Sequence, residues 1–153
     1  MILKDNPFSK CRFSQVGFVV RDLDDTMEKM RRVFEMEPAQ VSEGEIPGRK
    51  YRGEPGKFAA RIAFYYFGDV QFEFIQPVNE EGSIWKEFFD QGGEGLHHVR
   101  FAVDSFSQAE KHMKEKGIDV SMEGLSVVTE GARWACFDSE EQLGFIAEIF
   151  GVG

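Results

Sequence analysis

The sequence is poor in cysteine. Its 153 residues contain only two, Cys11 and Cys136, and they do not form a paired or CxxC spacing. A small domain stabilised by disulfides would need several closely spaced cysteines, so that class is not expected here. Such sparse cysteine usage fits a reducing compartment, and we expect a cytoplasmic protein.

Long apolar runs and basic runs are also missing. No segment approaches the roughly 18 consecutive apolar residues that a membrane-spanning helix needs, and residues 1–7 lack the apolar run of a signal peptide. The net charge is −9, from 18 basic and 27 acidic residues. Nucleic acid and anionic membrane surfaces are therefore not expected as main partners. A local positive pocket for an anionic small-molecule substrate stays open.

Large apolar side chains, by contrast, are abundant. Hydrophobic residues make up 42% of the chain, and 16 of the residues are phenylalanine. A chain of this length and composition can bury a sizeable core in one or two small domains.

The segment Gly95–Val103 reads as a strand with two chemically different faces. Val99, Phe101 and Val103 alternate with His98 and Arg100, and successive side chains of a strand point to opposite faces. One face therefore packs on a core, while the other carries an imidazole and a guanidinium. This pattern indicates a site on the second face, and we interpret it as a metal site.

The chain repeats itself with a shift of 83 residues. With Gln15 placed on His98, a strand and a following helix coincide in both halves. Each half then continues into a strand hairpin that carries a glutamate near its end, Glu73 in the first and Glu148 in the second. Each half is thus predicted to read strand, helix, strand, strand, strand, with repeats at about 13–77 and 95–151.

Two such halves side by side would enclose a cleft, because one open sheet with a single helix cannot bury both of its faces. Four polar residues at equivalent places would then face that cleft: Gln15, Glu73, His98 and Glu148. One imidazole nitrogen and three oxygens suit a divalent ion such as Zn²⁺, Mn²⁺, Co²⁺, Ni²⁺ or Mg²⁺. Taken singly, a glutamate in a strand is usually solvated and a histidine usually structural, so the argument depends on their recurrence.

Two local features leave alternatives. His97 competes with His98 as a ligand; strand alternation favours His98, which is in register with Gln15, and directs His97 to the other face. Residues 42–57 are polar and rich in glycine and proline, which predicts a long loop. Such a loop is either a lid that contacts substrate or a mobile surface segment.

The sequence resembles the vicinal oxygen chelate superfamily, which includes glyoxalase I, methylmalonyl-CoA epimerase, extradiol dioxygenases and bleomycin-resistance proteins. Four runs carry the resemblance: QVGFVVRDLD at 15–24, FEFIQP at 72–77, GEGLHHV at 93–99 and GFIAEI at 144–149. It implies an α+β fold of paired βαβββ modules that form a curved, mostly antiparallel sheet cleft, in one domain over 1–153.

The resemblance also implies a ligand set. The family places a metal ligand at each of four positions, which here hold Gln15, Glu73, His98 and Glu148. Epimerases of this family resemble His, Gln, His, Glu in strand order, whereas the order in this chain is the one that some glyoxalase I enzymes use. A dioxygenase is not expected, since those enzymes use two histidines and one carboxylate for iron.

The function implied is that of a metal-dependent lyase or isomerase that removes a proton next to a carbonyl or thioester. Glu148 is the expected main base, Glu73 a ligand and second base, and Arg100 a contact for a substrate carboxylate or phosphate. The substrate would be an acyl-CoA thioester or a 2-oxoaldehyde–thiol adduct, and the family resemblance implies a homodimer. The alternative is a non-catalytic small-molecule binder of the bleomycin-resistance type.

Overall fold

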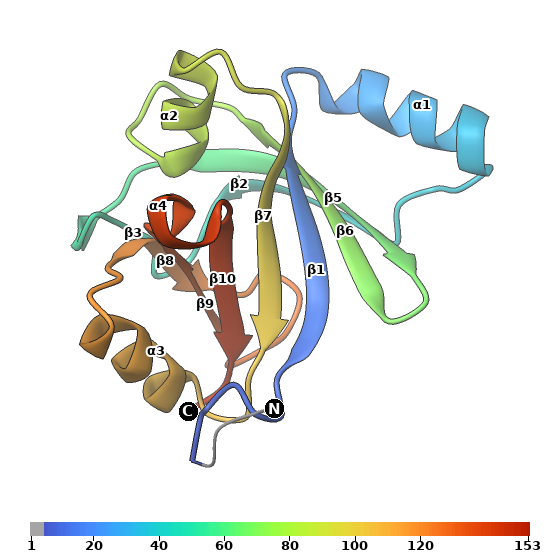
Figure 1. Ribbon diagram of the computed structural model, residues 1–153. Coiled ribbons are helices and arrows are strands. Elements are labelled where there is room, and N and C mark those ends of the chain that lie inside the picture. Colours follow the sequence, from blue (N-terminus) through green and yellow to red (C-terminus); the bar gives the residue numbers. More distant parts are fainter. Residues whose placement is uncertain (1–4) are drawn as a thin grey trace.

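The fold is a single curled sheet with two long helices on its outer side (Figure 1). The computed structural model describes residues 5–153. The ten strands are β1 (Arg12–Val19), β2 (Gln40–Glu45), β3 (Lys50–Tyr51), β4 (Glu54–Pro55), β5 (Ala59–Phe67), β6 (Val70–Pro77), β7 (Gly95–Ala102), β8 (Val120–Leu125), β9 (Arg133–Phe137) and β10 (Ile146–Gly151). The helices are α1 (Leu23–Phe34), α2 (Ile84–Asp90), α3 (Phe106–Glu115) and α4 (Glu140–Leu143).

The strand order is symmetric about the centre of the sheet. It runs β2-β5-β6-β1-β7-β10-β9-β8-β3-β4. The first strands of the two halves, β1 and β7, pair antiparallel, and each pairs in parallel with the last strand of its own half, β6 or β10. The α+β fold of paired βαβββ modules predicted from the sequence is confirmed.

Each of the two long outer helices begins at a side-chain N-cap. The side chain of Asp22 accepts a hydrogen bond from the backbone N–H of Asp25 at 2.9 Å, and the hydroxyl of Ser105 accepts one from the N–H of Gln108 at 3.4 Å. These contacts satisfy N–H groups that the first turn of a helix leaves without partners. Each helix then turns an apolar stripe toward its own half of the sheet, which fixes the sheet's outer face.

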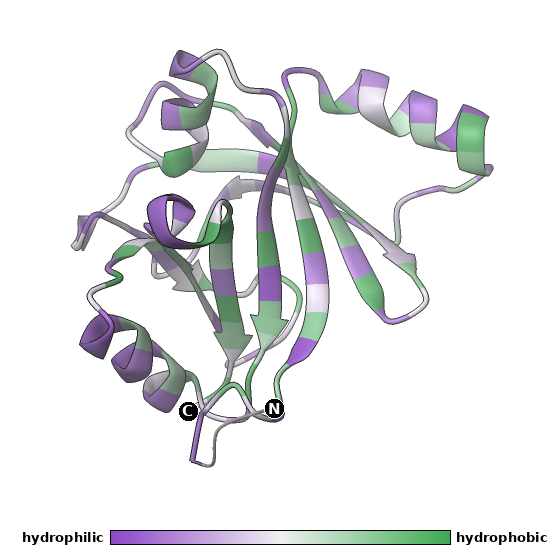
Figure 2. Cartoon of the chain, in the orientation of Figure 1, coloured by the Kyte–Doolittle hydropathy of each residue, from purple (hydrophilic) through white to green (hydrophobic). Residues whose placement is uncertain are grey.

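Three apolar clusters form the core. One lies between α1 and strands β5 and β6, around Leu23 and Tyr65; a second lies between α3 and strands β9 and β10, around Phe106 and Phe137. The third lies inside the curl of the sheet and includes Trp85 of α2. Along the central strands, hydrophilic and hydrophobic residues alternate (Figure 2), as a sheet with two different faces requires. No helix within residues 5–153 is both long and apolar enough to cross a bilayer.

The prediction of a loop over residues 42–57 is largely wrong. Residues 40–45 form the edge strand β2, and the two-residue strands β3 and β4 follow. β3 pairs with β8 of the other half, and the carbonyl of Pro47 accepts a hydrogen bond from the N–H of Leu125 at 2.8 Å. The segment therefore joins the two outer edges of the curled sheet. Edge strands expose polar residues to solvent, which is why this strand looks like a loop in the sequence.

Two β-bulges interrupt the central β1–β7 pair. Ser14 is the extra residue of β1, and His97 is the extra residue of β7. These two positions are related by the same 83-residue shift as the repeat. A bulge redirects the neighbouring side chains and strengthens the local twist. Between the two bulges the register places Gln15 opposite Arg100 and Gly17 opposite His98.

Candidate metal centre in the cleft between the modules

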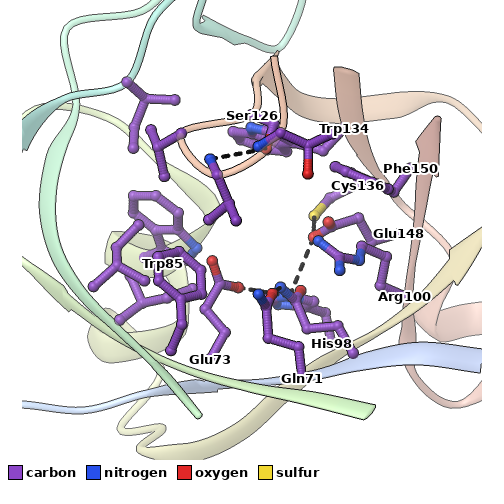
Figure 3. Close-up of a pocket in the computed structure, with 18 of the residues that line it drawn as sticks. Gln71, Glu73, Trp85, His98, Arg100, Ser126, Trp134, Cys136, Glu148 and Phe150 are labelled. Atoms are coloured by element: carbon purple, nitrogen blue, oxygen red, sulfur yellow. Dashed lines mark hydrogen bonds and ion pairs between the residues drawn. The ribbon is translucent and has the colours of Figure 1, made fainter. Parts of the chain in front are cut away.

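A cavity of about 100 Å³ lies inside the curl of the sheet, and both halves line it. Figure 3 shows its polar floor, with Glu73 and His98, and the indole of Trp134 on the opposite side. Residues 126–129, which connect β8 to β9, also line it. The apolar walls include Ile46, Ile62, Phe64, Ile75, Trp85, Val127, Val128, Trp134 and Phe150. Tyr66 lines the cavity as well.

Four side chains meet on the floor of this cavity, each from a different strand. The Nε2 atom of His98 lies 3.0 Å from Oε1 of Gln15. It lies 3.1 Å from Oε2 of Glu148 and 3.3 Å from Oε2 of Glu73. Gln15, His98 and Glu148 are almost wholly buried. The structure thus brings together all four residues that the sequence placed in the cleft.

A glycine opposite His98 makes room for its ring. A Cβ added to Gly17 would lie 1.9 Å from Cε1 of His98 and 2.2 Å from its Nε2. No larger residue fits at this position unless the imidazole moves. Gly17 is therefore part of the site, although its glycine gave no signal in the sequence until the register of β1 and β7 was known.

The charges around His98 favour its protonated form. Burial alone would lower the pKa of His98, but the carboxylates of Glu148 and Glu73 outweigh it, so the pKa of His98 is raised. Burial likewise raises the pKa of Glu148, against the opposing effects of His98 and Arg100. The two carboxylates therefore favour a positive charge at Nε2 of His98, which either a proton or a metal cation can supply.

The spacing of the donor atoms fits a shared metal ion. Two ligands on neighbouring coordination positions of a divalent ion, each at about 2.1 Å, are about 3.0 to 3.4 Å apart. The distances of 3.0, 3.1 and 3.3 Å from His98 Nε2 fall in this range. Within residues 5–153, however, no three His, Cys, Asp or Glu side chains already surround a common centre. The oxygens converge instead on Nε2 itself, so an ion would have to replace the proton on Nε2 and draw the oxygens round it.

The orientation of the Gln15 amide also depends on whether a metal ion is bound. In one orientation its oxygen faces His98, and its nitrogen donates to Oε1 of Gln71 at 2.6 Å. In the other orientation the nitrogen faces His98 and donates to Oε2 of Glu73 at 3.2 Å, while the oxygen accepts from Nη1 of Arg100 at 3.1 Å. The second orientation suits a His98 whose Nε2 carries no hydrogen, because the amide N–H would then have an acceptor. A protonated Nε2 or a metal ion requires the first, since the amide oxygen is the acceptor and ligand atom.

Arg100 lies beside the four donors with contacts to neutral groups. Its Nε donates to the hydroxyl of Ser14 at 3.0 Å, and its guanidinium carbon lies 4.3 Å from the centre of the Phe150 ring. A guanidinium has five N–H donors in a planar fork that matches a carboxylate or phosphate. Because Arg100 also lines the cavity, it is placed to contact an anionic group of a bound molecule.

Cys136 is a site residue that the sequence reasoning missed. Its thiol lines the cavity and lies 3.4 Å from Oε2 of Glu148. Burial, with a further effect from Glu148, raises the pKa of Cys136 well above its usual value, so the thiol stays protonated and donates to the carboxylate. The hairpin register, in which Cys136 lies opposite Glu148, could have identified it.

The bulge changes the prediction for His97. Strict alternation would direct its ring away from His98, but the two Nδ1 atoms are 3.0 Å apart. Burial and the neighbouring His98 lower the pKa of His97 to about 3. His97 is therefore a neutral imidazole behind the site. As predicted, His98 lines the cavity and His97 does not; strand alternation did not predict the contact between their Nδ1 atoms.

Several other charged residues near the cleft lie outside the cavity and are paired with neighbouring side chains. Glu43 and Glu45 are exposed and pair with Arg61 at 3.8 Å and Arg49 at 3.1 Å. Arg61 also pairs with Asp24, at the start of α1, whereas Arg133 stacks on Phe106, at the start of α3, with 4.1 Å to the ring centre. Arg61 and Arg133 lie at equivalent places near the start of β5 and β9. These repeated arginines thus connect each half's helix to its sheet, but through different contacts.

The comparisons with known proteins concern the family and the fold of the chain. The sequence profile of the Glyoxalase/Bleomycin resistance protein/Dioxygenase superfamily matches residues 14–137. Among curated proteins, an uncharacterised protein of Bacillus subtilis, YqjC, is 23% identical over 88 residues. That match covers 58% of this chain and only 62% of the relative's length.

Solved structures of similar fold include epimerases. A methylmalonyl-CoA epimerase of Streptomyces coelicolor, solved with 2-nitronate-propionyl-CoA, superposes with a TM-score of 0.70 at 20% identity, over 93% of this chain and 94% of that one. The epimerase of Mycobacterium tuberculosis gives a TM-score of 0.68 at 15% identity, over 92% and 87% of the two chains. At these identities the likeness establishes the fold.

Proposed function

The chain belongs to the Glyoxalase/Bleomycin resistance protein/Dioxygenase superfamily, and we propose that it is a metal-dependent enzyme that removes a proton from carbon next to a carbonyl or thioester. The observation that carries this proposal is the convergence of Gln15, Glu73 and Glu148 on Nε2 of His98, at 3.0 to 3.3 Å. A purely structural polar cluster has no need to gather two carboxylates at the floor of a cavity that a small molecule can enter.

The donor set fits a divalent ion. Gln15, Glu73, His98 and Glu148 would hold it, and its identity among Zn²⁺, Ni²⁺, Co²⁺, Mn²⁺ and Mg²⁺ depends on availability as much as on the ligands. Bound there, it would supply Lewis-acid stabilisation for the negative charge that develops on the substrate oxygen.

The protein's own groups divide the remaining work. Glu148 accepts the proton from carbon and returns it, to the same carbon in an epimerisation or to its neighbour in an isomerisation. Glu73 lies on the other side of His98 and would serve as ligand and second base. The apolar walls keep water from the deprotonated carbon.

The proposed substrate class is an acyl-CoA thioester. The fold shared with epimerases that bind acyl-CoA ligands supports it, and Arg100 provides a cation in the cavity for a carboxylate on the acyl group. A cavity of about 100 Å³ accommodates a small acyl group, while the CoA portion would extend outward. The Gln, Glu, His, Glu ligand order supports the alternative substrate, a 2-oxoaldehyde–thiol adduct.

The decisive experiment is proton exchange in deuterated water. Purified protein is incubated with methylmalonyl-CoA and, separately, with a methylglyoxal–thiol adduct, and deuterium incorporation is followed by NMR, with and without added divalent ions. Metal-stimulated incorporation into either substrate supports the proposal and identifies the substrate class. Absence of incorporation into both, with stoichiometric metal bound, would refute it.

A non-catalytic binding protein is the second candidate. The apolar walls and the Gln15 orientation that turns its nitrogen to His98 favour this function, since a binder needs no ion. Elemental analysis of protein purified without chelator separates the two, because the enzyme should retain about one ion per chain and the binder none.

A further inference from the structure

We infer that His97 is a positioning residue, which accepts a hydrogen bond from Nδ1–H of His98 and so keeps Nε2 of His98 directed at Glu73 and Glu148. This inference rests on the proposed function, because it treats His98 as the metal ligand through Nε2. It assigns a role to the histidine that strand alternation had excluded from the site.

The contact between the two rings is direct and shielded from water. Their Nδ1 atoms are 3.0 Å apart, and the rings are nearly perpendicular, at 89°. His97 is 5% exposed and His98 is 2% exposed. Two neighbouring strand residues normally point to opposite faces. The bulge at His97 is what allows the rings to meet.

Two nitrogens at this distance must share one hydrogen. Nε2 of His98 faces the carboxylates and is occupied there, by a proton or by a metal ion. With an ion on Nε2, or with both ring nitrogens protonated, His98 carries a hydrogen on Nδ1, so the acceptor is Nδ1 of His97. The hydrogen of His97 is then on its own Nε2. Only a neutral His98 with its single hydrogen on Nε2 would reverse the direction. Partners of this kind fix the tautomer and orientation of a metal-binding imidazole.

His97 is itself held from behind. Its ring packs edge-on against Phe88 of α2, with 5.1 Å between the ring centres. Its Nε2 is buried and forms no hydrogen bond with any described residue. It borders a second hollow of about 40 Å³, which Ser121 and Asp138 also line. That hollow is polar and large enough for one water molecule, which would accept from Nε2–H of His97.

The second bulge offers an internal parallel. Ser14, the extra residue of β1, is the repeat equivalent of His97, and its hydroxyl accepts a hydrogen bond from Nε of Arg100 at 3.0 Å. Each bulge therefore places one polar group where it holds a cleft side chain: Ser14 holds Arg100, and His97 holds His98. The same local geometry has two equivalent uses.

The test compares three variants for metal affinity and ring tautomer. His97→Leu removes the acceptor, while His97→Asn keeps an acceptor oxygen near the place of Nδ1. His112→Leu, in α3, is the matched control for a histidine outside the site. Zn²⁺ and Co²⁺ affinities are measured by competition with a chromophoric chelator, and ¹⁵N NMR of the histidine rings locates the hydrogens.

We expect His97→Leu to lose about 10- to 100-fold in metal affinity, the usual effect of removing the partner of a ligand histidine. His97→Asn should recover most of the loss, and His112→Leu should bind as the wild type does. In the wild type, ring hydrogens should be on Nδ1 of His98 and Nε2 of His97.

The failures are distinguishable. If the wild type binds no ion, the proposed function and this inference both fall. If the wild type binds the ion and folded His97→Leu binds it as tightly, only the inference falls. If His97→Asn is as weak as His97→Leu, the acceptor role is wrong. If His97→Leu does not fold, the wild-type NMR spectrum decides, and a hydrogen on Nδ1 of His97 would overturn the assignment.

Discussion

The two halves of the chain use equivalent positions for different purposes. Where the first half has Gln15, the second has His98; where the first has Gly17, the second has Arg100. Of the proposed ligand positions, only that of Glu73 and Glu148 holds the same residue in both halves. The first half thus supplies a neutral amide and open space, and the second supplies the imidazole and the guanidinium.

The strands that flank the glutamates differ in the same sense. Phe64 lies opposite Glu73, whereas the smaller Cys136 lies opposite Glu148. The thiol donates to the Glu148 carboxylate, while Phe64 gives Glu73 only an apolar neighbour. The repeated backbone therefore forms the cleft, while the residues that differ between the halves place the imidazole and the guanidinium in the second half.

The largest expected effect comes from replacing each glutamate by glutamine, which tests whether the two halves contribute unequally to proton transfer. Glu148→Gln should lower deuterium exchange into the substrate by about 10²- to 10⁴-fold, the usual contribution of a general base. Glu73→Gln should cost less, since it keeps a ligand oxygen and leaves the main base. The exchange rate is followed by NMR at saturating metal.

Metal retention in both variants is the control for that experiment. Equal losses in Glu73→Gln and Glu148→Gln would mean that the halves share the proton transfer. Full exchange in Glu148→Gln would mean that another group is the base.

The next largest expected effect comes from Arg100, the positive charge that the second half places in the cavity. Arg100→Met should lower kcat/KM for a carboxylate-bearing acyl thioester by about 10- to 100-fold, because a charge-assisted hydrogen bond contributes about 1.5 to 3 kcal/mol. An uncharged acyl thioester should lose far less. Steady-state kinetics on both substrates measure the difference.

Arg133→Met is the matched control, because Arg133 stacks on Phe106 and does not line the cavity. Equal losses on the charged and uncharged substrates would show that Arg100 acts on the site's structure and not on a carboxylate.

A third test fills the space that the first half leaves open. Gly17→Ala should destabilise the fold by about 1 to 3 kcal/mol through overpacking, and it should weaken metal binding because the new Cβ displaces the His98 ring. Urea unfolding and chelator competition measure the two effects.

Gly68→Ala separates site damage from general strain. Gly68 has a φ of 61° and no heavy atom within 4 Å of an added Cβ, so alanine there costs about 1 to 2 kcal/mol of backbone strain without touching the cleft. If both variants bind metal equally well, Gly17 has no special role.

The smallest expected effect is a difference in stability between variants of the repeated arginines, Arg61 and Arg133. Arg61 is held by Asp24 and Glu43, so the destabilisation by Arg61→Met should fade at about 1 M salt, where the screening length is about 3 Å. Arg133→Met loses a stacking contact of about 0.5 to 1 kcal/mol, which should persist. Thermal unfolding at low and high salt distinguishes them, and identical salt responses would contradict the difference.

Much of the fold could be predicted from local signals. The N-caps at Asp22 and Ser105, the apolar stripes that follow them and the Gly68-Asp69 turn are set by neighbouring residues, and the structure has all of them. The edge strand β2 could not be predicted, because it is identified as a strand only by its pairing with β5. The partner of β3 is nearly 70 residues further along the chain, and no local pattern indicates such a pair.

The candidate site divides in the same way. Recurrence at equivalent places in the two halves selected Gln15, Glu73, His98 and Glu148, with shifts of 83 residues for the first pair and 75 for the glutamates, because a repeated backbone places equivalent residues at equivalent points. Gly17 and Cys136 were not selected, since their importance depends on which atoms of another strand lie opposite them.

By itself, the sequence determined the two modules, their helices and the four side chains that share the cleft. Periodicity and repetition are properties of the chain, so they can be recognised in the sequence without knowledge of the fold. Only the tertiary structure decided that His97 contacts His98, because a bulge shifts register by one residue and alternation cannot reveal it. It also decided which polar atoms surround the Gln15 amide, since separate strands bring His98, Glu73 and Arg100 together there.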